Sequence, residues 1–186
     1  MSSAHGQCSL YLAPDQPDFT VQDLSSFVSA LQDIGLISHS IDPDNNDTGY
    51  YSGERYLDYI AYMGCAPAIQ FEATDGNHNF CFIRLHRYDV AELIYSNTQS
   101  RAPHCPACNK PVRSWQHNMN GRSILCDSCN TRSGIEKFDW RKMSGYARLF
   151  IEITDIFPKE AIPQQILLDK LSALSGTDWQ YFYSCR

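Results

Sequence analysis

Two Cys-x-x-Cys pairs place the strongest constraint on how this chain can fold. The pairs are Cys105 with Cys108 and Cys126 with Cys129, and 17 residues separate them. Such spacing is typical of sites in which four thiolates bind one zinc ion. Each pair can form a tight turn that directs two sulfurs at one point, so the segment between the pairs must bring the turns together. We therefore predict that these four cysteines bind one Zn²⁺.

The segment between the pairs has the pattern of a β-hairpin. Residues 112–117 and 122–125 flank residues 118–121, which contain Asn-Gly, the pair favoured in tight hairpin turns. A third strand is expected at residues 135–140. With the four cysteines and the proline after Cys105, residues 101–142 resemble a zinc ribbon.

The resemblance covers under a quarter of the chain and implies a metal-binding role for the four cysteines alone. Asn109 and Asn130 stand where ribbons commonly have glycine, and asparagine tolerates the left-handed conformation needed there. Four protein ligands leave no coordination position for water or substrate, so the metal is expected to be structural. Iron in the same thiolate cage is the alternative metal, and a pair of redox-active dithiols is the alternative chemistry.

The other cysteines do not form a recognisable pattern. Cys8, Cys81 and Cys185 lie in strand-like runs, where a free thiol packs as a small apolar residue. We predict no disulfide for them. Cys65 lies in a segment with glycine and proline that predicts a bend, and pairing with His78 or His86 would make it a thiolate nucleophile.

Outside residues 101–142 the apolar pattern predicts an α+β fold. The expected strands are residues 8–12, 56–63, 68–72, 80–85, 147–153 and 179–184, the expected helices are 21–34 and 163–174, and 42–53 is an expected loop. Thr20 is the expected N-cap of the first helix and Gly35 its end.

This order predicts a mixed or antiparallel sheet with two helices on one face, of the ferredoxin-like type, interrupted by an inserted zinc ribbon. We expect residues 1–100 and 143–186 to be the two halves of one α+β domain, and residues 101–142 to be the insertion.

Charge is distributed unevenly along the chain. The whole protein has 15 basic and 21 acidic residues, a net charge of −6 that argues against extensive nucleic-acid binding. Residues 101–142, however, contain eight basic and three acidic residues, so the remainder carries −11. Lys110, Arg113 and Arg122 are candidates to contact phosphates, with Trp115 as a stacking surface. Alternatively, these charges keep the hairpin soluble or face the acidic body.

A second set of aromatic residues, Trp179, Tyr181 and Tyr183, alternates along the last expected strand and therefore shares one sheet face. Bases can stack on such a face, but the glycine-aromatic motif of RNA-recognition domains is missing, so packing against the helices is the favoured interpretation.

The sequence predicts no membrane span and no secretory or transit segment, so the expected location is cytoplasmic. Three functional hypotheses follow. The favoured one is a non-enzymatic zinc-binding adaptor or regulatory protein that contacts another protein. The alternatives are RNA or DNA binding through the basic zinc ribbon, and a thiol-dependent enzyme that uses Cys65.

Overall fold

The computed structural model describes residues 8–45, 49–63, 69–73, 80–96, 101–157 and 160–185. Within these residues the chain has an α+β fold with antiparallel strand pairs and four helices, two of which are single turns. None of these helices is long and apolar enough to cross a membrane.

Six strands form the main sheet, and each neighbouring pair in it is antiparallel. Their order is β11-β1-β9-β5-β3-β2. The bounds are Cys8–Pro14 for β1, Ile37–Ser40 for β2, Tyr50–Ser52 for β3, Ile83–Tyr95 for β5, Ser144–Ile153 for β9 and Trp179–Cys185 for β11. A separate pair joins β4 (Ile60–Tyr62) to β10 (Ala161–Pro163).

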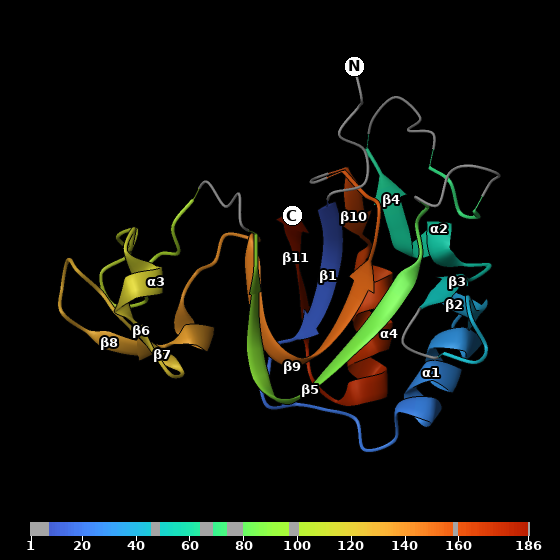
Figure 1. The fold of residues 1–186 in the computed structure, drawn as a ribbon, viewed down its shortest axis with the longest axis horizontal. Coiled ribbons are helices and arrows are strands. Elements are labelled where there is room, and N and C mark those ends of the chain that lie inside the picture. Colours follow the sequence, from blue (N-terminus) through green and yellow to red (C-terminus); the bar gives the residue numbers. More distant parts are fainter. Residues whose placement is uncertain are drawn as a thin grey trace.

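The two longer helices, α1 (Leu24–Asp33) and α4 (Gln165–Ser175), lie on one side of the main sheet (Figure 1). Alternate strand residues point toward them, because successive side chains of a strand face opposite sides. This core contains Leu10, Leu12, Leu149, Ile151, Ile153 and Trp179 from the strands and Phe27, Leu31, Leu167 and Leu171 from the helices. Tyr181 and Tyr183 pack against the same core, which confirms the packing interpretation of the last strand.

Strands β5 and β9 are long and bend together toward the segment that carries the cysteine pairs (Figure 1). At the bent end a smaller cluster packs on the opposite sheet face and includes Phe150 and Phe182. Gly145 lies so close to it that a β-carbon there would be 2.2 Å from the Phe182 ring. The Tyr183 amide donates to the Lys142 carbonyl at 3.0 Å, so the chain leaving the cysteine segment covers part of the outer edge of β11.

Helix α1 begins later than the sequence predicts. Its N-cap is Asp23, whose carboxylate accepts hydrogen bonds from the amides of Ser25 and Ser26 at 3.0 and 3.2 Å. The Thr20 cap is therefore wrong, because Asp23 satisfies two free amides of the first turn. Gly35 ends the helix as expected, at φ +76°.

Residues 56–63 were expected to be a strand, but the structure has a single helical turn, α2 (Tyr56–Tyr59), followed by β4. Tyr56 and Tyr59 lie three residues apart, so one turn buries both rings in the core. The described residues 69–73 contain no strand, so the strand predicted at residues 68–72 is wrong for these residues. The loop 42–53 contains β3 at its end.

The other predicted elements of the body are confirmed in type, with longer strands. Residues 8–12, 80–85, 147–153 and 179–184 correspond to β1, β5, β9 and β11, and 163–174 to α4.

Two of the cysteines form a disulfide, so the prediction of free thiols at these positions is wrong. Cys8 and Cys185 lie directly opposite each other in the register of β1 and β11, and their sulfurs are bonded. Their sequence separation is 177 residues, and only the pairing of the first and last described strands makes them neighbours. Cys81, by contrast, is a buried free thiol in the main core, as expected.

We expect reduction of the Cys8–Cys185 disulfide to lower the free energy of unfolding by about 2 to 5 kcal/mol, because the bond restricts the unfolded chain. Urea unfolding of the intact protein, with and without a reductant that leaves bound metal in place, measures the change. In the double variant Cys8→Ser with Cys185→Ser the reductant should have no further effect. Equal unfolding curves of the oxidised and reduced protein would contradict the expectation.

Candidate metal centre

The two Cys-x-x-Cys turns have the same backbone geometry. In each, the amide four residues after the first cysteine donates to the carbonyl of that cysteine: Asn109 to Cys105 and Asn130 to Cys126, both at 2.9 Å. Both asparagines adopt the left-handed conformation, at φ 57° and 55°, which confirms that they act in place of glycine. The two turns are therefore local structures that the sequence specifies in the same way twice.

The turns bring all four sulfurs together. The Sγ atoms of Cys105, Cys108, Cys126 and Cys129 lie within 4.8 Å of one another. The Cys105–Cys129 and Cys108–Cys126 sulfur pairs are 3.8 and 3.7 Å apart. A tetrahedron with metal–sulfur bonds of about 2.3 Å has edges of about 3.8 Å. This cluster can therefore hold one metal ion in tetrahedral coordination.

The electrostatics of the cluster favour a cation. Hydrogen bonds from the side chain and backbone of Thr131 lower the pKa of Cys129 to about 6. The backbone of Lys110 acts on Cys108 in the same direction, but desolvation and its three thiol neighbours outweigh it and raise the pKa of Cys108 to about 11. Four adjacent sulfurs cannot all be anionic unless a positive charge lies among them. An all-sulfur donor set suits zinc or iron and not calcium or magnesium.

Between and after the two turns, the chain differs from the predicted hairpin. Residues 112–117 are not a strand, because Ser114 begins the helical turn α3 (Trp115–Asn118) by accepting hydrogen bonds from the amides of His117 and Asn118. The strands are β6 (Met119–Asn120), β7 (Ser123–Leu125) and β8 (Arg132–Gly134). A 3-10 turn, η1 (Ile135–Lys137), occupies the start of the expected third strand.

Residues 101–142, called here the cysteine module, pack against the body through two residues that we predicted to contact nucleic acid. Trp115 is 6% exposed and its ring lies perpendicular to those of Tyr95 and Trp140, so it offers no stacking surface. Arg122 donates to both carboxylate oxygens of Asp18 at 2.9 and 3.0 Å. Its guanidinium also lies 5.6 Å from the centre of the Tyr146 ring.

The other residues predicted to have a functional role are Lys110, Arg113 and Cys65. Lys110 and Arg113 are exposed on the cysteine module. Cys65, the proposed nucleophile, lies outside the described residues.

We found no match for this chain among protein-family models, curated proteins or solved structures.

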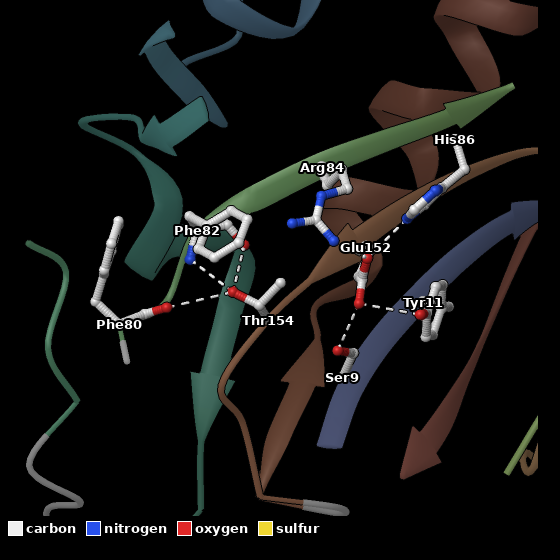
Figure 2. A network of polar contacts seen from close by, with 8 residues as sticks. All are labelled: Ser9, Tyr11, Phe80, Phe82, Arg84, His86, Glu152 and Thr154. Atoms are coloured by element: carbon white, nitrogen blue, oxygen red, sulfur yellow. Dashed lines mark hydrogen bonds and ion pairs between the residues drawn. The ribbon is translucent and has the colours of Figure 1, made fainter. Parts of the chain in front are cut away.

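A second polar site, which sequence analysis missed, is centred on a buried carboxylate on the sheet face opposite the helices (Figure 2). One oxygen of Glu152 accepts hydrogen bonds from the hydroxyls of Ser9 at 2.7 Å and Tyr11 at 3.0 Å. The other lies 2.7 Å from His86 Nε2 and 3.6 Å from the Arg84 guanidinium. The available signal was a glutamate within the apolar run of residues 149–153.

Opposing effects act on this carboxyl group. Burial raises the pKa of Glu152, but hydrogen bonds from His86, Ser9 and Tyr11 and the charge of His86 outweigh burial and lower it to about 2. The carboxylate therefore stays ionised and ties β1, β5 and β9 together.

We expect the purified protein to contain one divalent metal ion per chain, and Cys126→Ser to abolish stoichiometric binding because it removes one of four ligands. Elemental analysis measures the ratio of metal to protein. Cys81→Ala is the matched control, since Cys81 lies in the main core, and it should retain the metal. Absence of metal, with the four clustered thiols all reactive in the native protein, would contradict the assignment.

We also expect Glu152→Gln to lower the free energy of unfolding by about 3 kcal/mol at neutral pH. Because the pKa is lower in the folded state, the stabilisation is present above about pH 4.5 and is lost as the pH falls toward 2. The difference in the free energy of unfolding between wild type and variant should therefore decrease as the pH falls from about 4.5 to 2. Urea unfolding at a series of pH values tests this, and a constant difference would refute it.

Proposed function

We propose that the cysteine module is a zinc ribbon that binds one structural Zn²⁺, and that the protein is a non-enzymatic adaptor or regulatory protein that contacts another protein. The observation that carries the proposal is the sulfur–sulfur spacing of 3.7 to 3.8 Å, which matches tetrahedral Zn²⁺ coordination. Zinc has no redox chemistry and no preferred geometry of its own, so it suits a closed thiolate cage. The proposed role of the ion is to hold the two turns together.

A structural role follows from the ligand set. Cys105 and Cys126 are buried and Cys108 and Cys129 are half-buried. With four protein ligands, no coordination position remains for a water or a substrate. The proposed zinc would supply folding energy to a small module whose own apolar core is limited.

An adaptor role is supported by how the module is attached. The Arg122–Asp18 ion pair and the packing of Trp115 hold it against the body, and Ala107 and Ser128 at the tips of the turns are exposed. A preorganised surface loses less conformational freedom when a partner binds. The alternative is that this module binds nucleic acid. Of the four residues predicted to do so, Lys110 and Arg113 are exposed and take no part in the contacts described for Trp115 and Arg122.

We further infer that the body has a ferredoxin-like arrangement. The strand order β11-β1-β9-β5, antiparallel throughout, together with α1 after β1 and α4 before β11, supports this inference. The cysteine module then lies between β5 and β9 as an insertion. A cytoplasmic location remains a prediction, and the Cys8–Cys185 disulfide weighs against it because disulfides are typical of oxidising compartments.

The adaptor proposal predicts a stoichiometric protein partner in affinity capture from the native host. Capture should persist after nuclease treatment and should be lost with Cys126→Ser, because the unmetallated module cannot keep its surface ordered. Quantitative mass spectrometry of the captured proteins measures both effects. Cys81→Ala again serves as the control. A partner that nuclease removes would contradict a direct protein contact, and no enriched partner would refute the adaptor role.

A further inference from the structure

The sheet face opposite α1 and α4 carries a row of aromatic and basic side chains at its β2–β3–β5 end. These residues, called here the aromatic face, are His39, Tyr51, Phe80, Phe82, Arg84 and His86. Neighbouring ring centres are 4.8 Å apart for His39 and Tyr51, 5.7 Å for Tyr51 and Phe80, and 5.3 Å for Phe80 and Phe82. The row therefore runs from β2 across β3 to the segment that precedes β5.

Strand alternation explains why these side chains share a face. Tyr50 and Ile83 are paired across β3 and β5 and belong to the core beneath the helices. The neighbouring residues Tyr51 and Arg84 must then point to the opposite side. The same period places Phe82 and His86 on that side with Arg84.

Hydrogen bonds fix the positions of the two phenylalanines (Figure 2). The Phe82 amide donates to the Thr154 hydroxyl oxygen at 3.0 Å. That hydroxyl lies 3.3 Å from the Phe80 carbonyl and 3.1 Å from the Phe82 carbonyl, either of which can accept its proton. Thr154, the residue that follows β9, thus holds the segment before β5 against the sheet.

Contacts also fix the positions of the basic side chains Arg84 and His86. The Arg84 guanidinium lies 5.1 Å from the centre of the Phe82 ring, a cation–π contact. Glu152, paired with Arg84 across β5 and β9, contacts both Arg84 and His86 (Figure 2). Both side chains therefore have a set orientation before any ligand arrives.

Exposure and charge show what this face can bind. His39 is exposed, Tyr51 and Phe82 are half-buried, Phe80 is buried, and the side chains of Arg84 and His86 are 32% and 22% exposed. The side chain of Glu152 beside them is 3% exposed, and its carboxylate oxygens contact Ser9, Tyr11, His86 and Arg84. In a chain of net charge −6, the aromatic face thus presents rings and basic groups together.

We propose that the aromatic face binds single-stranded nucleic acid. Bases would stack on the rings at the His39 and Tyr51 end, and Arg84 would contact backbone phosphates. Rings that lie half-buried in a sheet can reach only bases that are already unstacked, so a duplex is not a ligand. The binding surface is on the body, and the cysteine module does not contribute to it.

Fluorescence anisotropy with labelled oligo(U) and oligo(dT) of about 12 nucleotides tests the proposal on the full-length, metal-loaded protein. We expect binding that weakens steeply as salt rises from about 50 to 200 mM, with a smaller salt slope for Arg84→Gln. An unlabelled duplex of the same length should compete poorly. The two labelled strands distinguish RNA from DNA as the better ligand.

The variants separate this face from the basic module. Arg84→Gln and His39→Ala should each weaken binding by about tenfold, whereas Arg113→Gln, an exposed cation of the cysteine module, should leave binding unchanged. His39 is exposed, so its variant keeps the test valid if Arg84→Gln proves unstable in thermal unfolding. Three results would overturn the proposal: no binding at low salt, equal competition by duplex, or an effect of Arg113→Gln as large as those of the two face variants.

Discussion

Four sulfur atoms within 4.8 Å of one another can all be thiolates only if a cation lies among them. Residues 101–142 hold the four cysteine sulfurs at this spacing. The two turns that supply the sulfurs repeat the same hydrogen bonds and the same left-handed asparagine. The regular secondary structure of residues 101–142 is short: β6, β7 and β8 have two or three residues each, and α3 and η1 are single turns. We therefore expect the order of the module to depend on the proposed metal site more than on its own strands.

The module and the body depend on each other because their contacts are shared. Trp115 packs between Tyr95, at the end of β5, and Trp140, while Arg122 reaches Asp18 before α1. The chain that leaves the module also covers the edge of β11 through the Lys142 carbonyl. If the module binds the proposed metal, its loss is expected to disturb the bent end of the sheet as well as the module, and the proposed adaptor surface would lose its fixed orientation.

The main sheet separates two kinds of chemistry. The side beneath α1 and α4 is an apolar core, whereas the other side combines a small apolar cluster with the ionised Glu152 and its partners. A buried carboxylate is tolerated because Ser9, Tyr11, His86 and Arg84 surround it with donors. The same arrangement fixes Arg84 and His86 on the aromatic face, so one buried charge contributes both to stability and to the proposed binding surface.

Local chemistry in the sequence determined the cysteine turns, the helix α4 and the alternating strands β1, β9 and β11, because each depends on residues close together in the chain. Tertiary structure decided the rest. Trp115 looked like a surface residue until its neighbours Tyr95 and Trp140 were known, and Cys8 met Cys185 only through the pairing of β1 with β11. Glu152, likewise, has partners from two other strands, β1 and β5. Contacts between residues so distant in sequence leave no periodic or spacing signal, so only the folded chain identifies them.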